Sequence, residues 1–579
     1  MIGLRPFSNL VGARYLDPQS LMLGATVLRD SGAFHEILRP HSDWIFATAP
    51  LPETLPDPPS LRRHGFMFAE GRDRVQSSLE AHNTRGTCLS LSDVAALSGD
   101  FCFIQVAPDG SAIAARSCAG VVPLYYATRP DRLLIATQLG WIARLLDDVE
   151  LDAVTHAGRL SGFSNLVYGR SLLKDVATLR CGTALELRAG EQPRVASYWD
   201  RPAADAPLAR TNARKKLEYA EEIRTLVTEN LRANLDPQGR NLLSLSGGID
   251  SAIVATVTRR HTPHTFRTHT WLPRDAGSRA LEERYILPLV EELSLPWAWD
   301  EQLSPQEQLQ LRRTRAPHAL LHCTQDDFCL FAREVAQNDT RVFFNGHFAD
   351  LLFDSRGQQT EDWLRLARLS SLLVGPRPPG QPARLLARWL WYRMIPKRSP
   401  RNAPTLWSGL SADAVEQFND WYASDIANRA PDARAEPLFL RGLHRRLCAL
   451  THLDAYWESA SASGARCAFP FLSRELVELS YRIHPSFHLP GPKELLRIGF
   501  AGIVSGRSLN RPDKGLRPTR RRSADWVKLS ADQVLAGQAL GLMSYRQPVG
   551  MPLPMRAADA LRLTRVVGTV RELCGMRHS

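Results

Sequence analysis

The stretch Asn241-Leu-Leu-Ser-Leu-Ser-Gly-Gly-Ile-Asp-Ser-Ala-Ile-Val-Ala-Thr-Val-Thr258 decides which fold the chain adopts. Residues 241–245 form a short, mainly apolar run of the kind found in strands that are buried on both faces. Residues 252–258 continue as an apolar helix, and the glycine-containing turn 246–251 joins the two. A strand, a glycine turn and a helix in direct succession predict a βα unit of a parallel sheet.

The turn carries the chemistry of a phosphate-binding loop. Its glycines let the backbone approach a polyanion closely, and the free amides of the following helix N-terminus favour phosphate. Ser246 and Ser251 offer hydroxyl donors, and Asp250 offers a carboxylate that can hold Mg²⁺ against phosphates. The Walker pattern is excluded, because the turn lacks its Gly-Lys-Ser/Thr ending. An ordinary glycine-rich turn is the alternative interpretation.

Further strands and helices alternate around this unit. A helical pattern covers about 214–235, with four apolar residues interpreted as one face: Leu217, Ile223, Val227 and Leu231. Strand-like runs at 268–272 and 341–344 and a helical segment at 280–293 follow. This alternation predicts a parallel sheet that is covered by helices on both faces.

Residues 1 to about 200 have a different pattern. Short β-type runs at 101–106, 111–116, 124–127 and 133–137 are separated by turn signals such as Asp109-Gly110. Their spacing predicts two packed sheets, and the proline-flanked stretch 202–207 is interpreted as a linker. A length of 579 residues also favours more than one domain.

Composition narrows the setting but not the partner. Hydrophobic residues make up 44% and charged residues 23%, which is ordinary for a soluble globular protein. The net charge of +12 is compatible with nucleic acid, an acidic membrane surface or an anionic substrate. Nine cysteines without a CxxC pair or zinc spacing are typical of free thiols in a reducing compartment. With neither a signal-peptide pattern nor an apolar run long enough to span a bilayer, a cytoplasmic protein without a membrane partner is expected.

One segment is strongly basic. Residues 363–412 contain no Asp or Glu but nine basic residues: Arg365, Arg368, Arg377, Arg384, Arg388, Arg393, Lys397, Arg398 and Arg401. Such a run is most often a solvated surface, and a binding surface for a peptide substrate is the functional alternative. Nucleic acid is not expected as a partner, because the chain shows no recognisable RNA-binding motif.

The order of the motifs resembles that of asparagine synthetases. The loop 246–251 resembles the pyrophosphate loop of N-type ATP pyrophosphatases. The segments resembling the N-terminal glutaminase-like domain of the family are Leu97-Ser-Gly-Asp-Phe-Cys-Phe-Ile, Gly120-Val-Val-Pro-Leu-Tyr-Tyr, Leu133-Leu-Ile-Ala-Thr and Tyr198-Trp199. The segments resembling later family motifs are Asn345-Gly-His-Phe-Ala-Asp350, Phe469-Pro-Phe-Leu-Ser-Arg-Glu, Pro492-Lys493-Glu-Leu-Leu-Arg497 and Arg511-Pro-Asp-Lys514-Gly515. The similarity covers most of the chain, apart from about 357–440 and the C-terminal tail.

The resemblance implies two domains with different folds. Residues 1–200 resemble a degenerate class II glutamine amidotransferase domain, an N-terminal-nucleophile-type β sandwich with flanking helices. Residues 201–579 resemble an ATP pyrophosphatase domain, similar to the adenine-nucleotide α-hydrolases, with a parallel sheet and a basic helical insert at about 357–440. Glutamine-dependent members need a cysteine at the mature N-terminus. Since residue 2 is Ile and the first cysteine is Cys88, we expect the first domain to be structural and the nitrogen to come from elsewhere, for example from the substrate.

The second ATP-site motif narrows the resemblance to one branch. Lasso-peptide macrolactam synthetases carry Gly-His-Gly-Gly-Asp, and residues 346–350 keep the His and the Asp while replacing both middle glycines. In the related β-lactam synthetases a tyrosine matches His347, and in asparagine synthetases a glutamate does. The resemblance therefore implies ATP-dependent closure of a macrolactam in a ribosomally made precursor peptide. An Asp or Glu side chain would be adenylated and attacked by the peptide N-terminus, with release of AMP and pyrophosphate.

A leader peptidase and a leader-binding protein are the partners that this branch implies. The alternatives are a β-lactam synthetase or another small-molecule amide synthetase, and an inactive module that only binds peptide or RNA. The intact Asp250, Asp350, Lys493 and Lys514 argue against an inactive module.

The resemblance also implies roles for individual residues. ATP and pyrophosphate would be bound by Ser246, Gly247, Gly248, Asp250, Ser251, Lys493, Gly346 and Glu282, with Mg²⁺ on Asp250 and Asp350. The catalytic candidates are His347, Lys514, Asp454 and Glu458. His347 is a candidate base, because imidazole titrates near neutral pH, and Asp454 or Glu458 would orient it. Lys514 and Lys493 would meet charge that develops on the oxyanion and the pyrophosphate.

Each of these residues also has a purely structural interpretation. Asp250 can cap a helix, Asp350 can lie in a solvated loop, and both lysines can be surface residues. His347 can be a hydrogen-bonded structural histidine, and Glu282 can belong to a solvated helix face.

Overall fold

The computed structural model describes most of both predicted domains. The described residues are 7–31, 36–38, 42–50, 65–68, 87–97, 99–146, 149–161, 167, 169–199, 213–236, 238–261, 266–274, 276–301, 340–353, 386–387, 390, 394, 406, 410–427, 453, 456–457, 465–483, 487, 493–511, 526–528 and 554–556. Three predicted site residues, Asp454, Glu458 and Lys514, lie outside them, as do most of the basic segment and the predicted linker. Among the described helices, none has the length and apolar character needed to cross a membrane.

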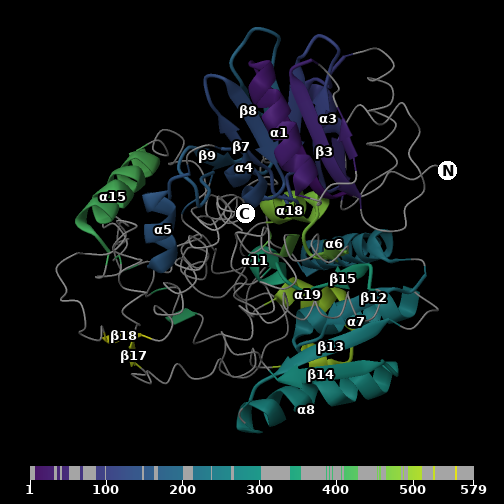
Figure 1. Ribbon diagram of the computed structural model, residues 1–579. Helices are drawn as coiled ribbons and strands as arrows, with labels where there is room; N and C mark the ends of the chain where they lie inside the picture. Colours follow the sequence, from purple (N-terminus) through teal and green to yellow (C-terminus); the bar gives the residue numbers. More distant parts are fainter. Residues whose placement is uncertain are drawn as a thin grey trace.

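Two antiparallel sheets form the N-terminal part (Figure 1). The first has the order β2-β3-β1-β8-β7-β9, with β2 Glu36–Leu38, β3 Trp44–Pro50, β1 Phe7–Tyr15, β8 Arg132–Ala136, β7 Tyr125–Thr128 and β9 Val176–Thr178. The second has the order β11-β10-β6-β5-β4, with β11 Arg194–Ser197, β10 Thr183–Leu187, β6 Ala112–Arg116, β5 Phe101–Val106 and β4 Gly65–Phe68. The predicted β-rich half with two sheets is therefore present.

Alternation along the strands builds two cores around the first sheet. Leu133 and Ile135 of β8 join a core with Phe103 and Ile113 of the second sheet, so the two sheets pack face to face. Leu134 of the same strand points to the other face and joins the core that contains residues of α1 (Pro18–Asp30) and α4 (Leu139–Leu145). The period of two along a strand produces this division.

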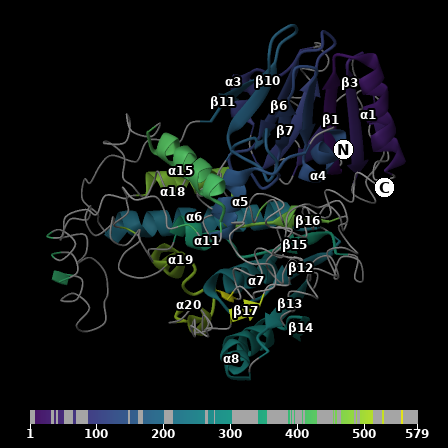
Figure 2. The same ribbon diagram turned by 60° about the vertical axis from the view of Figure 1, so that its left-hand side comes forward.

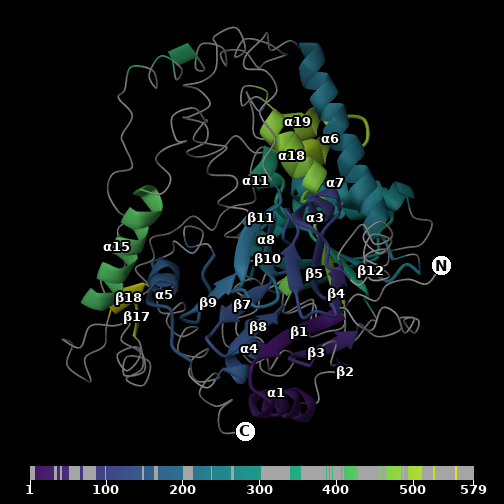
Figure 3. The same ribbon diagram turned by 90° about the horizontal axis from the view of Figure 1, so that it is seen from above.

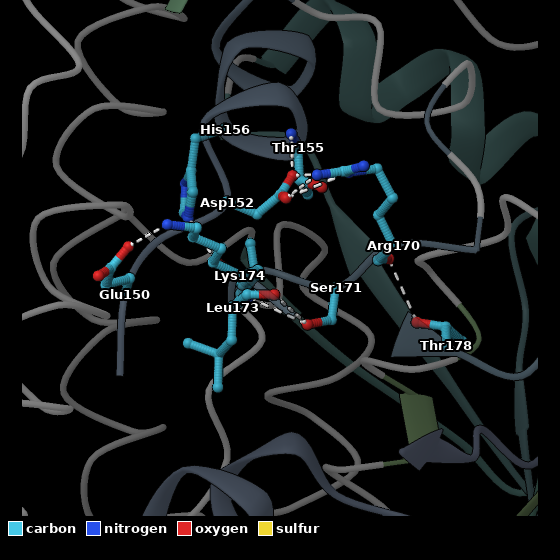
Figure 4. A network of polar contacts seen from close by, with 10 residues as sticks. Glu150, Asp152, Thr155, His156, Arg170, Ser171, Leu173, Lys174 and Thr178 are labelled. Atoms are coloured by element: carbon cyan, nitrogen blue, oxygen red, sulfur yellow. Dashed lines mark hydrogen bonds and ion pairs between the residues drawn. The ribbon is translucent and has the colours of Figure 1, made fainter. Parts of the chain in front are cut away.

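A network of polar contacts lies at the start of α5 (Ala153–Leu160) in the N-terminal part (Figure 4). Buried Asp152 accepts a hydrogen bond from the Thr155 backbone at 2.8 Å and forms an ion pair with Arg170. Lys174 pairs with Glu150 at 2.6 Å on the neighbouring segment. The helix α15 (Ala412–Ala427), which lies within the predicted insert, packs beside α5 (Figures 1 and 3).

The C-terminal part contains the predicted parallel sheet. Its order is β14-β13-β12-β15-β16, with β14 Trp297–Glu301, β13 Arg267–Leu272, β12 Asn241–Ser244, β15 Val342–Phe344 and β16 Arg466–Ala468, and every pairing is parallel. The central strand β12 has β13 on one side and β15 on the other, so the chain leaves it in both directions. In open α/β sheets ligands bind beyond the carboxyl ends of strands at such a switch point.

Helices pack around this sheet. They are α6 (Ala213–Asn234), α7 (Ile249–His261), α8 (Ala276–Leu293), α11 (Ala349–Phe353), α18 (Arg474–Arg482), α19 (Glu494–Gly499) and α20 (Gly506–Leu509). In Figures 1 and 2, α6 lies between the N-terminal sheets and the parallel sheet. The predicted helices 214–235 and 280–293 correspond to α6 and α8, with ends shifted by a few residues.

The interpretation of Leu217 as part of the buried face of α6 is wrong. Ile223, Val227 and Leu231 are fully buried, but Leu217 is 58% exposed. Leu217 lies six residues before Ile223, which is about 240° around a helix, so the two side chains point in different directions. Lys216 is buried instead, and its ammonium pairs with Glu494 of α19 at 3.0 Å.

Helix α18 connects the two parts of the chain. Arg474 donates hydrogen bonds to the carbonyl oxygens of Ala95 at 2.8 Å and Leu97 at 3.0 Å in the N-terminal part. Arg474 also binds Glu478 at 2.8 Å, and Glu478 accepts a hydrogen bond from the indole of Trp199 at 2.8 Å. The other side of α18 packs against α6 and α11. The N-terminal part therefore supports the helices that surround the switch point.

Candidate active site

The loop after β12 is shaped by a serine network. Gly247 has a left-handed φ of 61°, a conformation that glycine adopts without steric cost. The Ser251 hydroxyl accepts a hydrogen bond from the Ser246 backbone at 3.2 Å and donates one to the Gly248 carbonyl at 3.1 Å. Ser251 is buried, whereas Ser246 is exposed and Gly248 is half-buried. The Ser251 hydroxyl therefore links the start of the loop to the N-terminus of α7, while Ser246 stays accessible to solvent.

The second motif follows β15 and packs directly on this loop. The Asn345 backbone donates to the Ala468 carbonyl at 3.1 Å, and its side-chain oxygen accepts from the His347 backbone at 3.0 Å. Gly346 lies so close to the loop that a Cβ atom there would be 2.9 Å from the Ser251 nitrogen and 3.1 Å from the Asp250 carbonyl carbon. This contact explains why a glycine is needed at 346.

Phe348 departs from the family pattern at a strained position. Its φ is 76°, in the left-handed region that a bulky side chain rarely adopts. The family pattern Gly-x-Gly-x-Asp places a glycine here, which suits that backbone. Phe348 is buried, and its ring packs edge-on against Phe469 at 5.1 Å between centroids. Aromatic packing thus stabilises a backbone conformation that the Gly-x-Gly-x-Asp pattern obtains with glycine.

Lys493 joins the two predicted metal ligands. Its ammonium forms ion pairs with Asp250 of the loop and with Asp350 of the second motif, the latter at 2.7 Å. The Lys493 side chain is only 3% exposed, and its own backbone is left-handed, with φ of 55°, at the start of α19. Three residues that are separated by up to 243 positions therefore meet at the carboxyl ends of β12 and β15.

Asp250 and Asp350 are the residues of this site whose chemistry suits a divalent cation. The Oδ1 atom of Asp250 is buried and has no hydrogen-bond partner, so it is available as a ligand. In the described part of the chain, no group of three or more His, Cys, Asp or Glu side chains could hold a metal ion. Magnesium commonly uses one or two carboxylates and completes its shell with phosphate oxygens and water. Asp250 and Asp350 match that partial shell.

Glu282 is engaged by an arginine that the sequence analysis did not select. Arg511 binds Glu282 through two contacts, at 3.1 and 3.2 Å, and its guanidinium lies 4.3 Å from the ring centroid of Tyr285. Arg511 was visible only as the first residue of the motif that ends in Gly515. The bidentate geometry that marks its role depends on tertiary structure.

His347 lies on the same motif as Asp350, three residues before it, and is half-buried. Its ring is edge-on to Tyr456, with 5.7 Å between centroids, and the Tyr456 hydroxyl accepts a hydrogen bond from the Asn345 side chain at 3.0 Å. Tyr456 is a second residue that sequence reasoning missed. The predicted orienting acids of His347, Asp454 and Glu458, are not among the described residues, and neither is Lys514.

We expect Gly346→Ala to weaken nucleotide binding at least about tenfold, because an added methyl group displaces the second motif from the loop. Titration with a nonhydrolysable ATP analogue measures the effect. Gly506→Ala is the matched control, since a Cβ there meets its nearest neighbour at an ordinary 3.8 Å. Equal affinities for the two variants would show that the contact at 346 does not hold the site together.

Comparison with known proteins gives the family. The asparagine synthase model matches residues 222–548, which is more than half of the 579-residue chain. The chain belongs to the asparagine synthase family. Members of this family are ATP-dependent ligases that form amide bonds, and the parallel sheet and the loop of this chain lie within the matched region. No curated protein gave a significant match.

Several solved structures are similar to parts of this asparagine synthase family chain. Glutamine phosphoribosylpyrophosphate amidotransferase from B. subtilis, complexed with ADP and GMP, is 9% identical with a TM-score of 0.20, covering 50% of this chain and 65% of its own. The U34-tRNA thiolase NcsA from Methanococcus maripaludis is 14% identical with a TM-score of 0.18, covering 40% and 80%. NMN synthetase from Francisella tularensis is 16% identical with a TM-score of 0.16, covering 37% and 95%. The family assignment therefore rests on the sequence match.

Proposed function

We propose that this ligase activates a carboxylate as an acyl-adenylate and joins it to an amine within the same precursor peptide, closing a macrolactam. The observation that carries the nucleotide half of the proposal is the meeting of Asp250, Asp350 and Lys493 beside the loop 246–251. This arrangement offers amide donors, two carboxylates and one buried positive charge to a polyphosphate at the switch point of the sheet.

The residues divide the work of the first step. The loop amides and the hydroxyl of Ser246 hold the β- and γ-phosphates, and Lys493 offers positive charge to the departing pyrophosphate. A magnesium ion held by Asp250 and Asp350 would neutralise phosphate charge when bound. A carboxylate oxygen of the substrate attacks the α-phosphorus, and the bond to the bridging oxygen of pyrophosphate breaks. AMP is thereby attached to the carboxylate.

The second step needs a proton acceptor and an oxyanion donor. The attacking amine must lose a proton as the new C–N bond forms and AMP leaves. His347 is the proposed base, because it lies on the same motif as Asp350 and is half-buried rather than enclosed. Lys514 is proposed to stabilise the oxyanion, and Asp454 or Glu458 to orient His347. These three assignments rest on the family resemblance.

A ribosomally made precursor peptide is the proposed substrate. The replacement of the family tyrosine or glutamate by His347 and the basic segment 363–412 support this choice over a small amino acid. A leader peptidase would free the N-terminal amine and a leader-binding protein would deliver the peptide. A β-lactam-type or other small-molecule amide synthetase is the alternative.

The experiment is incubation of the protein with ATP, Mg²⁺ and the leader-free peptide encoded beside its gene. The expected product has lost one water and resists exopeptidases, and replacing the acceptor Asp or Glu of the peptide by its amide abolishes it. Dehydration of a free amino acid in place of the peptide would favour the small-molecule alternative. If the protein turned over ATP neither with the peptide nor with a free amino acid, both proposals would be contradicted.

We further propose that the N-terminal domain is structural and releases no ammonia from glutamine. Burial raises the pKa of Cys88 to about 11 and raises the pKa values of Cys102 and Cys118 above their ordinary range. Thiols held in the protonated form are poor nucleophiles. We expect no glutamate above background when the purified protein is incubated with glutamine, ATP and Mg²⁺. Glutamate formation would contradict this proposal if a covalent inhibitor of glutaminases abolished it.

A further inference from the structure

One buried arginine, Arg511, contacts the backbone of the loop 246–251. Arg511 Nη1 donates to the carbonyl oxygen of Ser246 at 3.4 Å, on the peptide that leads into the glycines. The same nitrogen lies 3.2 Å from Glu282 Oε2, and Nη2 lies 3.1 Å from Glu282 Oε1. The Arg511 side chain is 3% exposed. A forked pair of this kind fixes the plane of the guanidinium as well as its position.

Several elements hold this arginine in place. The ring of Tyr285 on α8 lies under the guanidinium, and the Arg511 carbonyl accepts a hydrogen bond from Arg497 of α19 at 3.2 Å. Gly247 rests on the same surface, since a Cβ there would be 3.1 Å from Arg511 Nη1 and 3.0 Å from Ile286. The loop, α8 and α19 therefore meet at Arg511.

The position of Arg511 in the sequence adds a second connection. Lys514, the proposed oxyanion donor, follows it by three residues. A chain of three residues spans at most about 11 Å, so fixing Arg511 limits where Lys514 can lie. Arg511 thus contacts the loop 246–251 and stands three residues before Lys514 in the sequence.

We propose that the Arg511–Glu282 pair positions the phosphate loop for nucleotide binding, with Arg511 acting through the Ser246 carbonyl and Glu282 acting through Arg511. Neither residue needs to touch the nucleotide. This inference rests on the proposed nucleotide site but not on the proposed peptide substrate. It also gives Glu282 a role that differs from direct contact with ATP.

The test is the affinity of the full chain for Mg²⁺ and α,β-methylene-ATP, measured by titration calorimetry well below the melting temperature. Arg511→Lys keeps the charge but loses the fork, and we expect about 10- to 100-fold weaker binding, as for a lost charge-assisted hydrogen bond. Glu282→Gln should weaken binding less. The double variant should bind as Arg511→Lys alone does, because the two residues act in series. Arg507→Lys on α20, where the arginine is exposed, is the matched control.

Three results would overturn the inference. Wild-type affinity in folded Arg511→Lys would show that the fork does not position the loop. Independent, multiplicative losses in the double variant would show that Glu282 does not act through Arg511. A wild-type chain that binds no nucleotide would refute the nucleotide site itself, whereas nucleotide binding without peptide cyclisation would refute only the proposed substrate.

Discussion

Lys493→Met should lower the rate of ATP–pyrophosphate exchange by about 10²–10³-fold, the usual loss when one well-placed electrostatic donor is removed. The structure gives the reason. The Lys493 ammonium is nearly inaccessible to solvent and pairs with both Asp250 and Asp350, so its charge acts in a region of low dielectric. Exchange of labelled pyrophosphate into ATP, in the presence of the carboxylate substrate, measures this step alone.

A second measurement separates loss of charge from loss of fold. Without the ammonium, the two carboxylates should attract a free divalent cation more strongly. We therefore expect Mn²⁺, in the absence of nucleotide, to bind Lys493→Met more tightly than the wild-type protein in titrations followed by electron paramagnetic resonance. Lys174→Met removes an exposed lysine of the Glu150 pair and serves as the control. Unchanged exchange in folded Lys493→Met would show that adenylation does not need the charge of Lys493. Unchanged Mn²⁺ affinity would show that this charge does not keep cations from the two carboxylates.

His347→Ala should affect the two chemical steps unequally. Formation of the acyl-adenylate releases no proton from an ionised carboxylate, so pyrophosphate exchange should persist. Ring closure should slow by about 10²–10⁴-fold, the range of general base catalysis. Mass spectrometry of the dehydrated peptide follows closure, and the exchange assay follows adenylation on the same preparation.

We expect the fold to tolerate this change, because His347 is half-buried and its backbone contacts do not depend on the imidazole. The His347 backbone N–H donates to the Asn345 side chain, and Gly346 packs against the loop. Asp250→Ala is the comparison, because it should lose both steps. If His347→Ala closed the ring at the wild-type rate, His347 would not be the base. If it lost exchange as completely as Asp250→Ala, His347 would belong to the nucleotide-binding shell.

The local pattern was sufficient to predict the sheet and the loop. Strand β12, the turn 246–251 and helix α7 follow from an apolar run, two glycines and a second apolar run that are contiguous in sequence. The predicted β-runs of the N-terminal half also correspond to strands β5 to β8. Leu217 does not belong to the buried stripe of α6, because its angle around the helix axis differs by about 240° from that of Ile223.

The contacts that build the site are tertiary and left little local signal. Arg511 is one of many arginines in a basic chain, and only folding reveals its fork on Glu282. Tyr456 likewise becomes informative only where β15 and β16 bring Asn345 and Phe469 beside it. The glycine that the family pattern places at position 348 indicates a left-handed backbone there. That Phe348 keeps this backbone became visible only in the structure. Lys514, Asp454 and Glu458 stay predictions, as do the domain boundaries at 200 and 201.

In the proposed reaction, a substrate carboxylate attacks the α-phosphorus of ATP. This step is tested most directly by labelling the acceptor carboxylate of the peptide with ¹⁸O and analysing the nucleotide products by mass spectrometry. We expect AMP that carries one ¹⁸O atom, formed in equal amount to the dehydrated peptide, together with unlabelled pyrophosphate. ADP together with ¹⁸O in inorganic phosphate would show attack at the γ-phosphorus and would contradict adenylation of the carboxylate.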